Sequence, residues 1–205
     1  MKIIVFGASG KTGRLVVNEA LQNGYEVTAF VRDTGKLPIT HNHLTIIQGD
    51  ATNQEAIRNA LKGQDLVISC LGANNGLGKT TVLYEMTANI VNGMKAHNIS
   101  RIIYVASAGI DREIPGISGK IVMKTLANVL EDHRNAVQVI KENISHYTIV
   151  RPMGLTDNTF TGAYREAKTG IPDKGRSISR ADVADFILRA ITDESYKNQS
   201  VALAN

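Results

Sequence analysis

The chain carries a glycine-rich loop, GASGKTG, at residues 7–13, whose spacing suits phosphate binding. The loop fits the pattern G-x-x-G-x-x-G and lies directly after the apolar run KIIVFG, at the start of a helical pattern. Glycines permit a sharp turn and a close approach of the backbone to a pyrophosphate, and the free N–H groups of a helix N-terminus attract its charge. The loop therefore predicts a dinucleotide site; a glycine-rich turn without a ligand is the alternative.

The next predicted strand ends in an arginine, where many dinucleotide sites carry an acid. In sites specific for NAD, a carboxylate about 20 residues beyond the glycine loop bonds the ribose 2′-hydroxyl. Here Arg32 closes the strand and Lys36 lies a short loop further on. These two cations favour a 2′-phosphate, so the expected cofactor is NADPH or NADP. Asp33 lies one residue beyond the strand end and is equally suited to capping the loop.

Short apolar runs alternate with amphipathic segments along the chain. The apolar runs predict strands at 2–7, 25–32, 44–50, 65–72, 101–107, 147–152 and 200–204. The amphipathic segments predict helices at 11–24, 53–63, 80–99, 119–143 and 179–193, the last behind an N-cap Ser179. Strands that are apolar throughout and alternate with helices indicate a parallel sheet covered on both faces.

We therefore expect an α/β fold, a Rossmann-like doubly wound parallel sheet with strand order 3-2-1-4-5-6. Residues 1–205 would form a single NAD(P)-binding domain with a small C-terminal substrate-loop region. The least regular segments are 108–118 and 153–178. Both follow strand ends, where ligands bind in open α/β sheets, so both are expected to be substrate loops.

The composition disfavours several other classes of protein. The formal net charge is +4, without a run of five Lys or Arg residues, so we expect phosphate-bearing small ligands and no nucleic-acid partner. We see no signal peptide before the first strand and no apolar stretch that could span a membrane, and we expect a cytoplasmic protein. The five histidines and the single Cys70 lack the spacing of metal ligands, so no metal site is predicted.

A second glycine-containing segment, GANNGLGKT at 72–80, partly matches the phosphate-binding P-loop of nucleoside triphosphatases. That pattern requires glycine at position 73, which is Ala73, and the segment follows the fourth strand rather than the first. The segment is more plausible as a loop beside the nicotinamide half of the cofactor.

Several of these motifs together resemble one family over essentially the whole chain. They are FGASGKTG, GYEVTAFVRD with KLP, GD at 49–50, GQDLVISCLG, MKAH at 94–97, EDH at 131–133, TGAY at 161–164 and SRADVADFIL. The chain resembles the atypical short-chain dehydrogenase/reductases of the NmrA-like group, and within it the biliverdin-IXβ reductase/flavin reductase type. The resemblance implies an NADPH-dependent oxidoreductase.

The resemblance also implies which residues contact the cofactor. The pyrophosphate would be held by Gly7, Ser9, Gly10, Lys11, Thr12 and Gly13, and the 2′-phosphate by Arg32 and Lys36. Asp50 and Ala51 would flank the adenine, and Leu71 and Gly72 would line the middle of the cofactor. Ser107 would lie near the nicotinamide, together with Pro152 and Met153.

The chain departs from the wider superfamily in its acid–base residues. Ordinary members carry Tyr-x-x-x-Lys on the helix before the sixth strand, but that frame falls here on Val129 and His133, and residues 119–143 contain no tyrosine. A literal match, Tyr164 and Lys168, lies beyond the sixth strand, and we interpret it as a coincidence or part of a substrate loop. The segment PMGL lacks the histidine that the flavin/biliverdin type often shows after the sixth-strand proline.

These features predict hydride transfer to a conjugated small-molecule acceptor such as a flavin, a bilin or a quinone. Such an acceptor spreads negative charge and can take its proton from water, so no tyrosine is needed. Ser107 is the candidate catalytic residue; satisfying a backbone group at the strand end is its alternative role. A non-catalytic NADP(H)-binding redox regulator of the NmrA type is the alternative function, and an epimerase is disfavoured. We expect a monomer or a weak homodimer.

Overall fold

The central sheet is built from the apolar runs, and its topology follows the predicted order. A computed structural model describes residues 1–72 and 76–205. Within them, the main sheet runs β3 (Leu44–Gln48), β2 (Glu26–Val31), β1 (Lys2–Phe6), β4 (Leu66–Ser69), β5 (Arg101–Val105), β6 (His146–Pro152), β10 (Gln199–Ala204) and β8 (Arg165–Ala167). The order 3-2-1-4-5-6 is confirmed. The expected last strand, β10, extends the sheet in parallel, and β8 pairs with it antiparallel.

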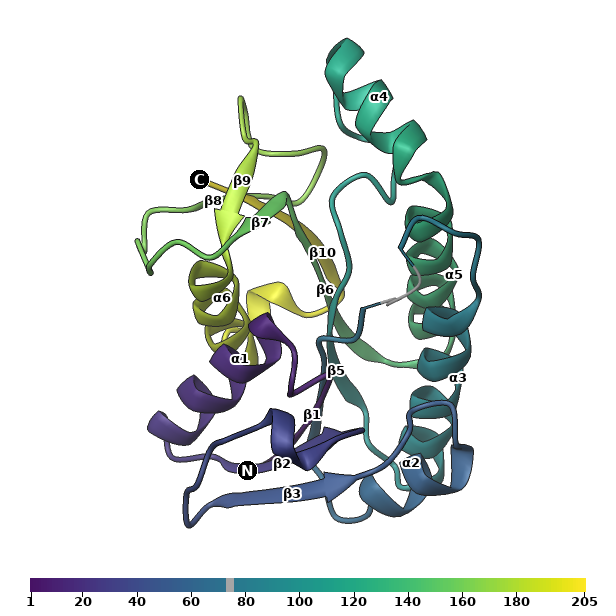
Figure 1. Ribbon diagram of the computed structural model, residues 1–205, viewed down its shortest axis with the longest axis vertical. Helices are drawn as coiled ribbons and strands as arrows, with labels where there is room; N and C mark the ends of the chain where they lie inside the picture. The colour runs from purple at the N-terminus through teal and green to yellow at the C-terminus, as the bar shows by residue number, and fades with distance from the viewer. Residues whose placement is uncertain (73–75) are drawn as a thin grey trace.

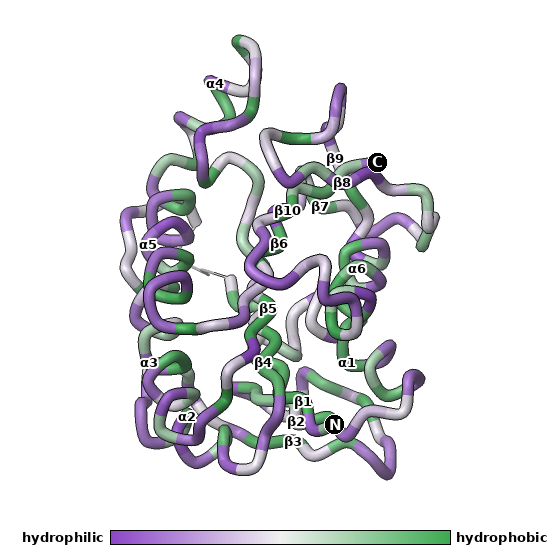
Figure 2. Tube along the Cα trace, turned by 180° about the vertical axis from the view of Figure 1, so that it is seen from behind, coloured by the Kyte–Doolittle hydropathy of each residue, from purple (hydrophilic) through white to green (hydrophobic). Residues whose placement is uncertain are grey.

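Helices cover both faces of this sheet, as the doubly wound fold requires. The helices α1 (Lys11–Gln22) and α6 (Arg180–Thr192) lie on one face, and α2 (Gln54–Ala60), α3 (Val82–Ala96) and α5 (Ala127–Asn143) lie on the other (Figure 1). Alternate strand residues point to opposite faces, so Ile3 and Val5 enter one core and Ile4 and Phe6 enter the other. Figure 2 shows the apolar strands enclosed between these two layers.

The predicted helix at 119–143 is two helices in the structure, so that prediction was wrong. Helix α4 (Gly116–Thr125) begins after Pro115, and Leu126, with φ −94° and ψ 11°, separates it from α5. Helix α4 projects away from the rest of the fold (Figure 1), and its Ile117 and Ile121 are exposed. No glycine or proline marks the break at Leu126, which is why the sequence pattern merges the two helices.

The segment 153–178 was expected to be irregular but contains ordered strands. β7 (Gly154–Thr156) pairs with β9 (Ser177–Ser179) in a separate two-stranded sheet. The third strand of this segment, β8, belongs to the main sheet. The buried carboxylate of Asp182 accepts the N–H groups of Thr161 and Gly162 at 2.9 Å each, which fastens the TGAY motif to α6. Burial opposes the ionisation of Asp182, but donors from Thr161, Ser179 and Gly162 keep its pKa below the usual value. Ser179 caps α6 as predicted, since its Oγ accepts the N–H of Asp182 at 2.9 Å.

Three further observations bear on the chemistry that the fold can support. No helix among the described residues has the length and apolar character needed to cross a membrane. These residues also contain no cluster of three or more side chains that could hold a metal ion. Burial raises the pKa of Cys70, which follows β4, to about 12, so its thiol is protonated at neutral pH.

Candidate functional site

A cavity of about 620 Å³ opens at the carboxyl ends of β1 to β4. This volume lies within the range of cofactor sites. Eleven residues of the predicted cofactor site line its wall: Gly7, Ser9, Gly10, Lys11, Thr12, Arg32, Lys36, Asp50, Ala51, Leu71 and Gly72. Eight further wall residues were not predicted: Phe30, Val31, Gly49, Thr52, Cys70, Val82, Met86 and Arg180. The structure therefore brings the glycine loop and the predicted 2′-phosphate residues into one site.

The glycine loop at residues 7–13 is packed so closely that side chains would collide with the backbone. A Cβ on Gly7, whose φ is +74°, would lie 2.5 Å from the carbonyl oxygen of Cys70, and a Cβ on Gly13 would overlap the carbonyl oxygen of Gly7. Helix α1 then begins at Lys11, without a side-chain cap and without an acidic residue in its first turn. Its first N–H groups are therefore available to an anion, as a pyrophosphate site requires.

Arg32 and Lys36 form the cationic end of the cavity, on the loop that follows β2. This loop contains a short 3-10 turn, η1 (Thr34–Lys36), which Asp33 caps by accepting the N–H of Gly35 at 3.0 Å. The second oxygen of Asp33 lies 3.8 Å from Lys36 Nζ. Asp33 therefore stabilises the loop and partly neutralises Lys36, which leaves Arg32 as the main cation for a 2′-phosphate.

Arg14 connects the glycine loop to the loop after β2, although no sequence motif indicated this role. Its Nε donates to the carbonyl oxygen of Ser9 at 3.0 Å, and its Nη2 donates to that of Lys36 at 2.7 Å. The side chain thus fixes the spacing between the glycine loop and the loop after β2. In the sequence, Arg14 reads as an ordinary exposed helix residue.

A partly apolar slot lies on the side of the cavity near β3 and α3. Phe30 packs against Gly49, where a Cβ would lie 2.5 Å from the aromatic ring. Asp50 accepts the N–H and the hydroxyl of Thr52 at 2.9 and 2.8 Å, and these bonds, together with the charge of Arg32, lower its pKa. With Ala51, Val82 and Met86 in the wall, the slot offers flat apolar surfaces and polar edges suited to a purine.

A bridging carboxylate connects the glycine loop to the segment 153–178. Asp157 forms an ion pair with Lys11 of the glycine loop, and it accepts a hydrogen bond from Arg180 Nη1 at 2.5 Å. The hydrogen bond from Lys11 is the main cause that lowers the pKa of Asp157. Arg180, at the start of α6, also lines the cavity, so Lys11 and Arg180 place two cations beside the expected pyrophosphate.

Ser107, Pro152 and Met153, as well as Gly13, were predicted to contact the cofactor but do not line this cavity. The first three lie together at the neighbouring edge of the sheet, where Ala108 N–H donates to the carbonyl oxygen of Pro152 at 2.9 Å. Ser107 Oγ donates to the carbonyl oxygen of Ala108 at 3.0 Å, which is the alternative role considered for it. The catalytic role of Ser107 therefore stays a prediction.

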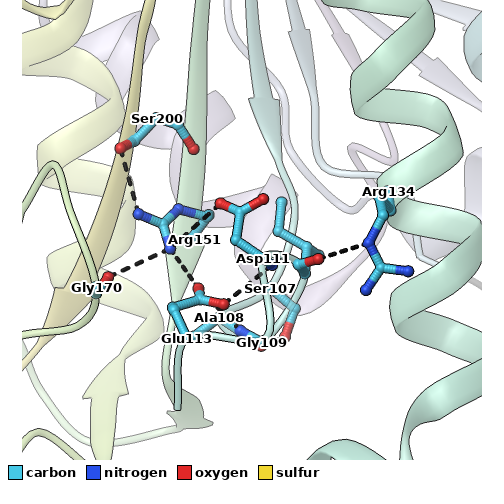
Figure 3. A network of polar contacts seen from close by, with 10 residues as sticks. Ser107, Ala108, Gly109, Asp111, Glu113, Arg134, Arg151, Gly170 and Ser200 are labelled. Atoms are coloured by element: carbon cyan, nitrogen blue, oxygen red, sulfur yellow. Dashed lines mark hydrogen bonds and ion pairs between the residues drawn. The ribbon is translucent and has the colours of Figure 1, made fainter. Parts of the chain in front are cut away.

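A buried ion pair organises both expected substrate loops at that edge (Figure 3). The side chain of Arg151, on β6, is 2% exposed and pairs with Glu113, and Asp111 lies 3.8 Å away. Arg151 also donates to the carbonyl oxygen of Gly170 at 3.3 Å. The two oxygens of Glu113 in turn accept the N–H groups of Gly109 and Asp111 at 3.0 Å each. Because a buried charge must be paired, this network fixes segments 108–118 and 153–178 relative to β6.

The helix position that holds lysine in the usual Tyr-x-x-x-Lys frame is occupied by a structural histidine. His133 is buried in α5, and its Nδ1 lies 3.0 Å from Tyr104 Oη. Burial lowers the pKa of His133 to about 4, so the ring is neutral at neutral pH. The preceding Asp132 caps α3 by accepting the N–H groups of Leu83 and Tyr84 at 3.1 and 2.9 Å. The EDH motif therefore supports the packing of α5 on β5 and α3.

The literal Tyr-x-x-x-Lys match at residues 164–168 is engaged elsewhere. Tyr164 Oη donates to Asp185 at 2.6 Å and accepts from Arg189 at 2.8 Å, and burial is the main cause that raises its pKa. Lys168 Nζ donates to the carbonyl oxygen of Ser195 at 3.3 Å. Since these contacts lie on α6 and η2 (Glu194–Tyr196), the pair does not form an acid–base site at the cavity.

A parallel sheet with a glycine loop after β1, an uncapped helix N-terminus and a cationic end defines a dinucleotide-binding Rossmann protein. The chain belongs to the NAD(P)H-binding family, which it matches over residues 7–194. This membership confirms the nicotinamide dinucleotide cofactor and agrees with the resemblance to the atypical short-chain dehydrogenase/reductases. The loop at 72–80, part of which lies outside the described residues, adds nothing to this assignment.

The relatives differ in how much of their length this chain represents. The uncharacterized protein YwnB of Bacillus subtilis is 29% identical over 217 residues, which cover 97% of this chain and 96% of that protein. Protein TIC 62 of Arabidopsis thaliana, a chloroplastic protein, is 28% identical over 215 residues, which cover 90% of this chain but 32% of TIC 62. The chain thus spans about a third of the length of TIC 62.

Solved structures show the same fold over the whole chain. A short-chain dehydrogenase/reductase from Veillonella parvula in complex with NADP has a TM-score of 0.83 and 24% identity, covering 100% of this chain and 94% of that one. ChuY, an anaerobillin reductase from Escherichia coli O157:H7, has a TM-score of 0.84 and 22% identity, covering 100% and 97%.

Proposed function

We propose that the protein is an NADPH-dependent reductase that transfers a hydride to a conjugated acceptor such as a flavin, with bilins and quinones as further candidates. The observation that carries the proposal is the pairing of a dinucleotide cavity with a buried, neutral His133 in the acid–base frame. A ketone reductase needs a proton donor at the developing alkoxide. His133, with a pKa of about 4 and its Nδ1 engaged by Tyr104, is unsuited to that task.

A conjugated acceptor removes the need for that donor. NADPH supplies the hydride when it is bound. A flavin or quinone spreads the incoming negative charge over several atoms and takes its proton from water. The residues of this chain would therefore contribute binding, orientation and closeness rather than acid–base catalysis.

Each part of the site has a proposed task in holding the cofactor. The N-terminus of α1, with Lys11 and Arg180, would bind the pyrophosphate. Arg32 and, more weakly, Lys36 would bind the 2′-phosphate. The slot beside Asp50 would take the adenine.

At the acceptor end, Ser107 is the proposed catalytic residue. Its hydroxyl would exchange its hydrogen bond with Ala108 for one to the acceptor or to the nicotinamide carboxamide. Pro152 and Met153, on the adjacent strand end, would lie beside the nicotinamide ring.

Two of the similar structures support this choice of ligands. The Veillonella parvula protein was solved with NADP, and ChuY is described as an anaerobillin reductase. A cytoplasmic location, a monomeric or weakly dimeric state, and the lack of nucleic-acid or membrane partners stay predictions.

The test is the loss of NADPH absorbance with a panel of FMN, riboflavin, quinones and bilins, with simple ketones as the comparison. We expect turnover with the conjugated acceptors and little with the ketones. Turnover confined to ketones would contradict the proposal. Tight NADPH binding with no turnover across the panel would favour the second candidate, a non-catalytic NADP(H)-binding regulator.

A further inference from the structure

A second cavity, of about 390 Å³, lies between the 109–112 loop, α4 and α5. It is separate in its lining from the dinucleotide cavity. Its wall is formed by Gly109, Arg112, Lys120, Met123, Lys124, Ala127, Leu130, Glu131 and Arg134. Gly109 lies two residues beyond Ser107, so this cavity adjoins the proposed acceptor end of the site.

The wall of this basic pocket carries four cations and one carboxylate. The cations are Arg112, Lys120, Lys124 and Arg134, and the carboxylate is Glu131. Among the residues that the structure describes, none of the four cations lies within 4.0 Å of a carboxylate oxygen. Like charges gathered in one concave site create a positive potential that favours an anionic ligand.

The acidic residues of the same loop are turned to the other side. Glu113 and Asp111 face Arg151, and the two oxygens of Glu113 also bind backbone N–H groups (Figure 3). Arg134 reaches the loop from α5 and uses its Nε to donate to the carbonyl oxygen of Ile110 at 2.7 Å, which leaves its two terminal nitrogens for another acceptor. The loop thus separates its charges, with acids toward β6 and cations toward the pocket.

The backbone conformation of Arg112 adds to this arrangement. Its φ is +59°, in the left-handed region that an arginine rarely adopts, and its N–H donates to the carbonyl oxygen of Gly109 at 3.0 Å. Such a conformation persists only when its surroundings hold it in place, and it is frequent at ligand sites. Here the turn that it makes carries Arg112 into the wall of the pocket.

The rest of the wall is apolar and gives the ligand a second property. Leu130 is buried, Met123 is half-buried, and Ala127 completes the surface beneath the cations. An anionic group on an apolar or conjugated body matches this combination better than a free inorganic ion does.

We propose that this pocket binds the anionic tail, a phosphate or a carboxylate, of the acceptor whose conjugated ring lies near Ser107. The inference rests on the proposed reductase function and specifies its substrate class as anionic. The pocket shares no wall residue with the dinucleotide cavity, so cofactor and acceptor tail would occupy separate sites.

The test compares pairs of acceptors that share a ring and differ in charge. FMN and riboflavin differ by a phosphate, and a bilin and its dimethyl ester differ by two carboxylates. Binding to the NADP-loaded protein is followed by the quenching of flavin fluorescence or by the bilin absorbance, without turnover. We expect the anionic member of at least one pair to bind about tenfold more tightly, as one charged hydrogen bond implies. The preferred pair distinguishes a phosphate from a carboxylate.

The variant Lys120→Gln/Lys124→Gln should bring the anionic member toward its neutral partner and leave the neutral one unchanged. Lys62→Gln/Lys141→Gln, at exposed positions outside the pocket, removes the same charge and should have no such effect. Equal binding within both pairs, or an equal loss for both members in the variant, would overturn the proposal.

This design separates failure of the pocket from failure of the proposed function. Reduction of both members of each pair with equal binding would reject the anionic pocket and leave the reductase standing. Preferential binding of FMN or the bilin without any reduction would support the pocket and reject the reductase.

Discussion

Arg32 should determine the preference of this protein for NADPH over NADH. It lies in the cavity wall at the end of β2, while the neighbouring carboxylate of Asp33 is engaged in capping η1 and faces Lys36 at 3.8 Å. A charged hydrogen bond contributes about 1.5–3 kcal/mol, and a tenfold change in affinity corresponds to about 1.4 kcal/mol. Arg32 should therefore provide a preference of about 10- to 100-fold. Lys36, partly neutralised by Asp33, should add a smaller share.

The perturbation is Arg32→Gln, which removes the charge, followed by Arg32→Asp, which reverses it. Arg32→Gln should lower the affinity for NADPH about 10- to 100-fold and leave the affinity for NADH nearly unchanged, because NADH has no 2′-phosphate. Arg32→Asp should weaken NADPH further through repulsion. Both dissociation constants can be measured by titration of cofactor fluorescence at low salt. Raising the salt should weaken NADPH more than NADH in the unmutated protein, since the extra charge pair is screened.

The control is Lys62→Gln, which removes one exposed positive charge outside the cavity and should alter neither affinity. Equal dissociation constants for NADPH and NADH in the unmutated protein at low salt would refute the reasoning. That result would mean that the guanidinium of Arg32 points into solvent rather than toward the ribose.

Three other results are expected. Arg180→Gln should lower the affinities for NADPH and NADH by the same factor in the same titrations, because both cofactors carry the pyrophosphate. A loss of affinity confined to NADPH would contradict this prediction. Ser107→Ala should slow turnover and leave the affinity for NADPH unchanged. His133→Ala should lower the thermal stability and leave turnover nearly unchanged. Loss of all activity in His133→Ala would instead identify this histidine as a general acid. Burial, and then repulsion by Asp185, raises the pKa of Glu19 to about 7, so stability should fall as the pH rises from 4.5 to 7. Glu19→Gln should therefore raise the free energy of unfolding at pH 8 by about 1–2 kcal/mol after solvent screening, and have no effect near pH 4 in urea titrations.

The cofactor half of the site could be predicted because its signals are local in the sequence. The glycine loop, the strand end at Arg32 and the GD at 49–50 each follow a strand, and parallel strands bring their carboxyl ends to one edge. Arg14, Arg180 and Arg151 were missed because their partners are distant in sequence. Arg14 donates a hydrogen bond to the carbonyl oxygen of Lys36. Arg180 forms an ion pair with Asp157, which also pairs with Lys11. No local pattern encodes such contacts, and the break between α4 and α5 at Leu126 is likewise set by tertiary packing.

The distribution of charge along the sheet edge fits the proposed hydride transfer without a tyrosine. Arg32 and Lys36 lie at the β2 end, Lys11 and Arg180 lie near the glycine loop, and the basic pocket lies beyond Ser107 at the β5 end. Between these cations lie apolar wall residues such as Leu71 and Met86 and internal ion pairs such as Arg151 with Glu113. Two anionic ligands held at their outer ends would have their uncharged rings directed toward each other near Ser107. A hydride transfer that needs closeness and alignment, but no protein acid, is the chemistry that this arrangement favours.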